Sequence, residues 1–112
     1  MKNGVPETAA FETQGGERSR VTGALGFTTV TPLLAVGAAA IAQGRAAVID
    51  LSAVTGSDSS GLALLIEWLS VARGAGRTLH YENIPAQLHQ LARLSDVDVL
   101  LSGNVAAAAA TA

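Results

Sequence analysis

The residues best placed for chemistry are Asp58, Ser59 and Ser60, which crowd the point where a buried-strand run changes into a helix pattern. A helix start exposes backbone N–H groups without partners and the positive end of the helix dipole. Such a place suits a hydrogen-bond acceptor, a bound anion or a phosphorylated hydroxyl. The simplest role is a cap, since Asp and Ser are frequent there. Ser57 and Thr55 are then ordinary turn residues.

Catalytic use of this segment is disfavoured by what surrounds it. A triad of Ser59, His80 and an Asp lacks the Gly-x-Ser-x-Gly elbow, and an Asp adjacent to the Ser cannot orient a base. The run from Gly56 to Gly61 has P-loop-like glycine spacing, but Leu62 stands where the phosphate-binding Lys is needed. We therefore predict no enzyme activity and no nucleotide site.

Composition excludes several other classes. The chain has no cysteine, and neither histidine has a second ligand at metal-binding spacing, so we expect no metal and no cofactor. A net charge of −2 with scattered Lys and Arg argues against nucleic acid. The N-terminus lacks a signal-peptide pattern, and the alanine-rich stretch near residues 31–42 is too short for a bilayer. We expect a cytoplasmic protein without direct membrane insertion.

The elements that must position the polar segment follow the order β-β-α-β-α-β-α, with Val97–Leu101 as an additional edge strand or extended segment. The expected strands are Phe11–Gln14, Arg18–Leu25, Ala46–Leu51 and Arg77–Tyr81, with a polar turn over Thr55–Ser60. This order predicts an α/β fold, a small mixed sheet with helices mainly on one side. We expect residues 1–9 to be a flexible lead-in, 10–102 a single domain, and 103–112 a disordered alanine-rich tail.

Three helices are expected between the strands. The first begins with Thr31 as N-cap and Pro32 at the first helical position, and it ends at Gly44. Gly37 is expected where this helix approaches the sheet. The second helix covers about Ser60–Ala72. The third covers Pro85–Leu94, and its inward residues are expected to be Leu88, Leu91, Ala92 and Leu94.

The second helix has two apolar stripes. One stripe consists of Leu62, Leu65, Ile66 and Leu69, and the other of Leu64, Trp68 and Val71. A single sheet can cover only one of them. We therefore expect the stripe with Trp68 to face a partner protein, the alternative being that Trp68 packs against a neighbouring helix.

A longer segment carries a family resemblance. It reads Ile49-Asp50-Leu51-Ser52, five further residues, and then Asp58-Ser59-Ser60-Gly61-Leu62-Ala63-Leu64-Leu65. This segment resembles the signature of STAS domains, the sulphate-transporter and anti-sigma-factor-antagonist fold, and within them that of MlaB-like proteins. Supporting matches are Val21–Leu25, Pro32–Leu34 and Leu91–Leu94, so the similarity covers about Phe11 to Leu101.

The resemblance implies a non-enzymatic subunit that binds and regulates the ATPase of a phospholipid ABC transporter maintaining outer-membrane lipid asymmetry. The direct partner would be the MlaF-like ATPase subunit and the indirect one the MlaE-like permease, holding the chain at the inner membrane. The expected partner-binding residues are Ser57, Asp58, Ser59, Ser60, Gly61, Leu64, Trp68 and Val71.

The resemblance also leaves a second function open. In anti-sigma factor antagonists the hydroxyl residue after the Asp is phosphorylated by a partner kinase, and this position corresponds to Ser59. MlaB-like proteins commonly have Thr there, so Ser59 is a departure toward the phosphorylated antagonists. The alternative is therefore a phosphorylation-switched anti-sigma factor antagonist. The extra apolar stripe could also serve a homodimer of the isolated chain.

Overall fold

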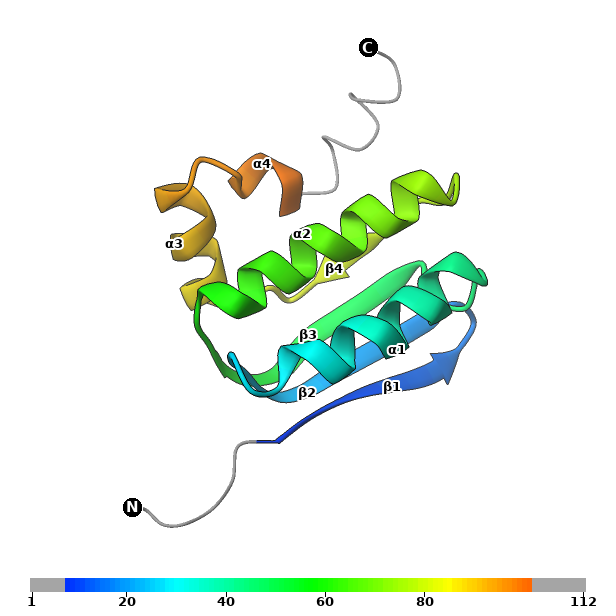
Figure 1. Ribbon diagram of the computed structural model, residues 1–112, viewed down its shortest axis with the longest axis horizontal. Helices are drawn as coiled ribbons and strands as arrows, with labels where there is room; N and C mark the ends of the chain where they lie inside the picture. Colours follow the sequence, from blue (N-terminus) through cyan, green and yellow to red (C-terminus); the bar gives the residue numbers. More distant parts are fainter. Residues whose placement is uncertain (1–7, 102–112) are drawn as a thin grey trace.

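A parallel pair of strands, β2 (Arg18–Leu25) and β3 (Val48–Ser57), forms the centre of a four-stranded sheet. Strand β1 (Ala9–Gly15) pairs antiparallel with β2, and the short β4 (His80–Glu82) pairs parallel with β3. The sheet order is therefore β1-β2-β3-β4, with one antiparallel edge (Figure 1). The structure is a computed structural model that describes residues 8–101.

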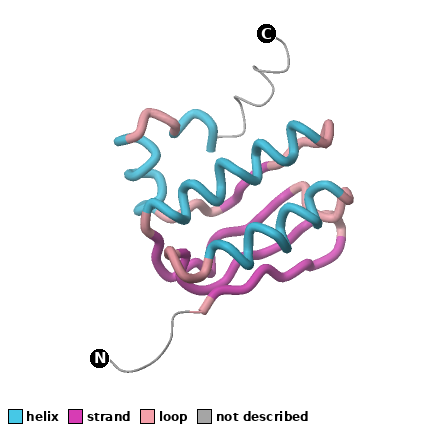
Figure 2. Tube along the Cα trace, viewed as in Figure 1, coloured by secondary structure: helices cyan, strands magenta, loops and turns pink. Residues whose placement is uncertain are grey.

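Helices α1 (Val30–Ala42) and α2 (Ser59–Gly74) lie side by side across one face of the sheet (Figures 1 and 2). Helices α3 (Ala86–Leu94) and α4 (Asp98–Leu101) pack beside α2, on the β4 side. The predicted architecture, a small mixed sheet with helices mainly on one side, is confirmed. Within residues 8–101, no helix is long and apolar enough to cross a membrane.

The two faces of the sheet differ in polarity because alternate residues of a strand point to opposite sides. On the side of the helices, Ile49 and Leu51 of β3 are fully buried. Asp50 lies between them and points the other way, toward a face where Arg18 and Glu82 form an exposed ion pair. The helices therefore pack on the apolar face of the sheet, whereas the polar face can remain in contact with solvent.

Strand β3 is longer than the sequence pattern predicts. The expectation was a strand over Ala46–Leu51 and a turn from Thr55 to Ser60, but β3 continues to Ser57. Its pairing with β2 extends to Leu25, which lies opposite Ser57, with two register shifts on the way. The polar residues stay extended because β2 supplies backbone hydrogen-bond partners along almost the whole strand, whatever the side chains are.

Helix α1 starts earlier than predicted. Its N-cap is Thr29 rather than Thr31, and Pro32 sits at the third helical position, where the first turn needs no N–H. Thr29 is buried, and its hydroxyl donates to the carbonyl of Ala24 at 2.8 Å and accepts from the N–H of Gly26 at 2.9 Å. The threonine therefore ties the loop before α1 to the end of β2.

Trp68 packs against α1, which corrects the prediction that its stripe faces a partner. The indole is fully buried, its Nε1 donates to the carbonyl of Leu34 at 3.3 Å, and its ring meets Phe11 edge-on with centroids 5.6 Å apart. Leu64 is buried as well, with 3% of its surface exposed, and Val71 is half-buried. The second stripe of α2 thus contributes to the domain's own core.

Gly37 makes this packing feasible. A Cβ atom at this position would overlap the six-membered ring of Trp68 and lie 2.6 Å from its Nε1. The close approach predicted for Gly37 therefore exists, but the neighbour is α2 and not the sheet. The missing side chain gives the indole its place between the two helices.

The C-terminal part of the chain departs further from the prediction. Residues Val97–Leu101 were expected to be extended, but Asp98–Leu101 forms α4, whose Leu101 is buried in the core. Strand β4 begins at His80 rather than Arg77. Leu94 was expected to face inward and is 86% exposed. It lies six positions after the buried Leu88, which places it on another side of the helix.

The predicted terminal segments fall almost entirely outside the described residues. Of the lead-in 1–9, only Thr8 and Ala9 are described, and Ala9 already pairs with Gly23 in the sheet. The tail 103–112 lies outside the described range.

Replacing Gly37 by Ala should destabilise the domain. The helix-propensity gain of about 1 kcal/mol is smaller than the overpacking cost against a rigid indole, which is typically about 1–3 kcal/mol. Urea unfolding followed by Trp68 fluorescence measures the difference. The matched control is Gly74→Ala at the end of α2, where an added Cβ has no neighbour within 4 Å. A stabilised Gly37→Ala variant would contradict the packing described above.

Candidate functional site

The polar residues singled out from the sequence lie at the sheet edge where β2 and β3 end. Leu25 and Ser57 are the last paired residues of these strands, and the N–H of Asp58 donates to the carbonyl of Leu25 at 3.1 Å. Both strands lead directly into helices at this edge, so the N-termini of α1 and α2 are neighbours (Figure 2). We call this the carboxyl edge: residues 26–29, between β2 and α1, with residues 58–61, between β3 and the first turn of α2.

Asp58 caps α2. Its backbone is extended, its Oδ1 accepts from the N–H of Ser60 at 2.7 Å, and its carbonyl accepts from the N–H of Gly61 at 3.0 Å. The side chain is exposed, so the carboxylate caps the helix and still presents its charge to solvent. Capping and partner binding are thus compatible for this residue.

The three serines of this segment have different environments. Ser57 is buried, its N–H donates to Oε1 of Gln87 at 3.1 Å, and its hydroxyl donates to the carbonyl of Asp58 at 3.0 Å. Ser60 is half-buried. Ser59 is exposed at the first helical position, and its hydroxyl forms no hydrogen bond with another described residue. Ser59 is therefore the hydroxyl of this segment most open to a partner or a kinase.

Gly61 allows the first turn of α2 to lie close to the sheet. It is buried, and a Cβ there would overlap the hydroxyl of Ser57 and lie 2.9 Å from Cβ of Leu25. The glycine thus sets how closely Asp58 and Ser59 are held to the ends of β2 and β3. Its role is packing rather than direct contact with a partner.

The structure does not bring His80, the base considered for Ser59, to the carboxyl edge. His80 pairs with Val48 at the beginning of β3, whereas Ser57 is the last residue of that strand. At about 3.3 Å per residue, the length of β3 separates the two ends by roughly 30 Å. No group of three or more acidic or histidine residues is placed to hold a metal ion within residues 8–101.

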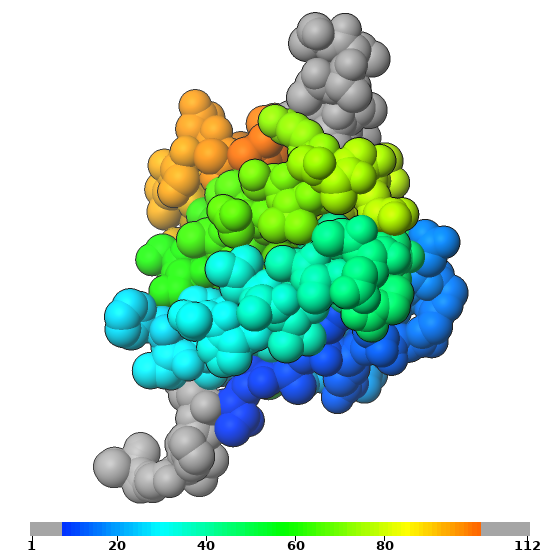
Figure 3. All heavy atoms as spheres, turned by 45° about the vertical axis from the view of Figure 1, so that its right-hand side comes forward, coloured from blue at the N-terminus to red at the C-terminus, as the bar shows by residue number. Residues whose placement is uncertain are grey.

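Phe27 lies on the carboxyl edge and is not among the site residues predicted from the sequence. Its side chain is 83% exposed, in the loop between β2 and α1. In the space-filling view, the segment that leads into α1 projects from one end of the molecule (Figure 3). The signal in the sequence is an aromatic residue within the segment Gly-Phe-Thr-Thr, in a chain with only 4% aromatic residues.

Asp50 belongs to the same motif, and the structure places it at the third position of β3, close to the beginning of the strand and far from the carboxyl edge. Its Oδ1 accepts from the amide of Asn83 at 2.9 Å and from the N–H of Ser52 at 3.0 Å. These hydrogen bonds, the one from Asn83 foremost, hold the pKa of Asp50 below its usual range, and the charge of Arg18 adds to the effect. Asp50 thus organises the polar face of the sheet.

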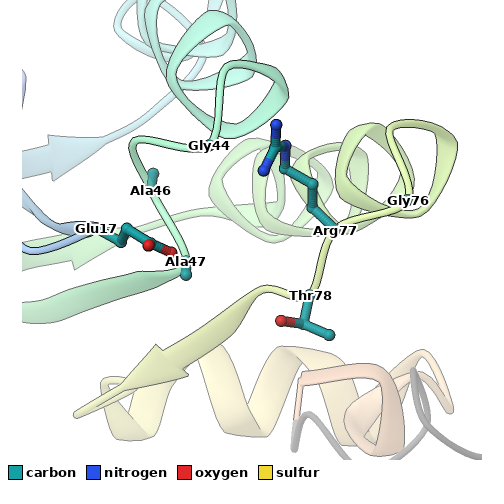
Figure 4. A pocket seen from close by; sticks show the side chains of 7 residues that line it. All are labelled: Glu17, Gly44, Ala46, Ala47, Gly76, Arg77 and Thr78. Carbon is teal, nitrogen blue, oxygen red and sulfur yellow. The ribbon is translucent and has the colours of Figure 1, made fainter.

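A hollow lies at the end of the molecule opposite the carboxyl edge. It has a volume of about 250 Å³ and is lined by Glu17, Gly44, Ala46, Ala47, Gly76, Arg77 and Thr78 (Figure 4). The Nε of Arg77 donates to the carbonyl of Ala42 at 3.2 Å, at the end of α1. A cation is favourable beside helix C-termini, which carry partial negative charge. The hollow therefore lies where α1 and α2 end, and Arg77 supplies the cation at the end of α1.

The fold and the carboxyl edge together define a small α/β binding domain. The chain belongs to the MlaB-type STAS domain family: the family model described as "Mlab, STAS domain" matches residues 12–102. STAS domain families are regulatory binding domains. No curated protein matches the sequence.

Solved structures show the same fold. One is the anti-sigma factor antagonist SpoIIAA in its unphosphorylated form, with a TM-score of 0.60 and 19% identity over 77% of this chain and 82% of that one. Another is the Bacillus cell fate determinant SpoIIAA in the phosphorylated form, with a TM-score of 0.61 and 19% identity over 80% and 84% of the two chains. At this identity the likeness establishes the fold, and it confirms the predicted STAS architecture.

Replacing Gly61 by Ala should lower the free energy of unfolding by about 1–3 kcal/mol, because the new methyl group collides with Leu25 across the strand ends. Gly56→Ala, at a β3 position where a Cβ meets nothing within 4 Å, is the matched control and should be neutral or stabilising. Chemical denaturation of both variants makes the comparison. Equal stability of the two variants would argue against the close approach.

Replacing Asn83 by Gly should raise the pKa of Asp50 toward its usual value, because the carboxylate loses the hydrogen bond from the Asn83 amide. Glycine is the suitable substitute because Asn83 has a φ of 57°. Carboxyl-carbon NMR during a pH titration reports the pKa directly. Since the folded-state pKa is lowered, the contribution of Asp50 to stability is present at neutral pH and is lost as the pH falls through that pKa. An unchanged pKa would show that Asn83 has no such role.

Proposed function

We propose that this chain is the non-enzymatic STAS subunit of a phospholipid ABC transporter, and that it regulates the ATPase subunit by binding it through Asp58 and Ser59. The observation that carries the proposal is the match to the MlaB-type family over residues 12–102. It is supported by the exposure of Asp58 and Ser59 at the start of α2. The chain would be cytoplasmic and held at the inner membrane through its partner, with indirect contact to the permease.

The proposed binding residues are fewer than the sequence predicted. Leu64 and Trp68 are buried and are no longer proposed as partner contacts. Ser57 and Gly61 pack beneath the exposed residues and fix their position. Asp58 and Ser59 remain, with the half-buried Ser60 next to them. Val71 is half-buried too, but it lies about 18 Å further along α2 and is no longer proposed. A carboxylate and a hydroxyl on a rigid helix start suit hydrogen bonding to a basic or polar surface.

Regulation through Ser59 is the second part of the proposal. Phosphorylation would add about −1.5 to −2 charges next to Asp58. The helix dipole stabilises such a charge within this chain, but in the complex the phosphate would lose its water at a surface whose basic side chain is already paired with Asp58. Phosphate on Ser59 would therefore weaken binding of the ATPase subunit.

Replacing Ser59 by Glu should weaken binding to the ATPase subunit by about tenfold or more, equivalent to about 1.4 kcal/mol. Glu in the first turn of a helix favours the fold, so lost binding will not reflect unfolding. The measurement is co-purification and calorimetric titration with the ATPase subunit of the phospholipid ABC transporter of the same organism. Ser70→Glu, at an exposed position further along α2, is the matched control and should bind like wild type. Equal binding of all three proteins would refute the role of Ser59.

A second function, a phosphorylation-switched anti-sigma factor antagonist, is favoured by the serine at position 59 with its exposed hydroxyl. Affinity purification from the native cell separates the two functions. An ATPase and a permease in the eluate support the transporter, whereas a kinase-like anti-sigma factor supports the antagonist. Neighbouring genes provide the same distinction. We propose the transporter first because the matching family model is described as MlaB.

A further inference from the structure

The hydrogen-bonded loop between β2 and α1 keeps the side chain of Phe27 exposed to solvent. Its side chain is 83% exposed, although its neighbours Gly26 and Thr29 are buried. The carbonyl of Gly26 accepts from the N–H groups of Thr29 at 2.9 Å and Val30 at 3.1 Å, and the Thr29 hydroxyl closes the turn on the other side. The ring therefore stays exposed in the lone chain, and fixing it in a complex would cost little conformational entropy.

The ring also lies at the same edge as the proposed contact residues. Phe27 follows Leu25 by two positions and Ser59 follows Ser57 by two, and Leu25 and Ser57 are opposite each other in the parallel pair. Both segments leave the sheet at this edge (Figure 1). An exposed aromatic ring next to polar groups is the usual composition of a protein–protein contact centre.

The charges at this edge indicate what kind of surface it fits. Residues 26–29 carry no charge, and the whole of α1 carries none either. In residues 58–61 the only charged side chain is Asp58. Within these two segments, the edge thus presents an aromatic ring and a single carboxylate among uncharged residues. Its complement is an apolar pocket with a basic side chain at its border.

The same charge disfavours two other occupants. A bilayer surface that contains anionic lipids attracts Lys and Arg, and neither residue type occurs in residues 26–29 or 58–61. A symmetric contact of the carboxyl edge with its own copy would bring two Asp58 carboxylates together. A partner protein of different sequence avoids both conflicts.

We infer that Phe27 is the apolar anchor of the carboxyl edge and inserts into a pocket of the partner protein, where a basic side chain at the pocket's border faces Asp58. This inference rests on the proposed function, in which the partner is the ATPase subunit. It moves the apolar part of the contact from α2, whose Trp68 is buried, to the loop before α1.

The test compares two equally exposed apolar residues. Phe27→Ala should weaken binding to the ATPase subunit by about thirtyfold or more, as expected for an aromatic anchor. The matched control is Leu94→Ala, which removes an 86%-exposed side chain at the far end of α3 and should leave affinity unchanged. Both side chains are in solvent, so neither variant should unfold, and thermal melts of the chain alone verify this.

A second variant, Asp58→Asn, tests the contribution of the Asp58 charge to binding. Asn caps a helix about as well as Asp, so the variant keeps the fold and loses only the charge. Its association with the ATPase subunit should be slower and less sensitive to salt than that of wild type. If the association rate of the wild-type protein does not depend on salt, the inference that a basic side chain of the partner faces Asp58 is wrong.

The outcomes separate this inference from the proposed function. If wild type binds the ATPase subunit and Phe27→Ala binds equally well, the anchor is wrong and the proposed function stands. Equal losses for Phe27→Ala and Leu94→Ala would also overturn it. If Phe27→Ala instead abolishes binding to vesicles with anionic lipids, or self-association, and leaves ATPase binding intact, the occupant is a membrane or a second copy. If wild type does not bind the ATPase subunit at all, both proposals fail.

Discussion

The packing of Trp68 against Gly37 is the contact on which the arrangement of this domain depends. It joins the two long helices through the one place on α1 where a side chain is missing, and the indole reaches the carbonyl of Leu34. Because the helices are fixed side by side, their N-termini meet at one edge of the sheet. The loop before α1 and the start of α2 become a single surface for this reason.

The sheet contributes the second constraint. Strands β2 and β3 run parallel and end opposite each other at Leu25 and Ser57. Parallel strands place the loops that follow them at a common edge, where α/β domains usually bind their ligands. Gly61 then lets α2 begin close to the strand ends. Asp58 and Ser59 are consequently held on a rigid support, as a contact surface requires if binding is to be specific.

The carboxyl edge is notable for its division of roles between buried and exposed residues. Ser57, Gly61 and Thr29 are buried and shape the edge, whereas Asp58, Ser59 and Phe27 are exposed and remain available. Neighbours in sequence thus have different tasks. A motif defined by sequence alone combines the two groups, because residues that support a surface and residues that form it are adjacent in the chain.

Much of the fold followed from local pattern. The mixed sheet, the order of elements along the chain and the one-sided helices depend on the succession of strand and helix patterns. The STAS assignment depends on a contiguous segment around Asp58. The capping role of Asp58 is likewise local, since a cap involves only the next few residues.

The errors have one cause, which is that the sequence does not show what packs beside an element. Predicting the length of β3 required knowing that β2 pairs with it up to Ser57. Predicting the burial of Trp68 required knowing that α1 has a glycine at the contact. Predicting the exposure of Phe27 required knowing that no element within residues 8–101 covers its loop. The sequence by itself determined the kind of domain and the polar centre of its surface. Only the tertiary structure decided which apolar side chains are inside, because burial depends on neighbours distant in the chain.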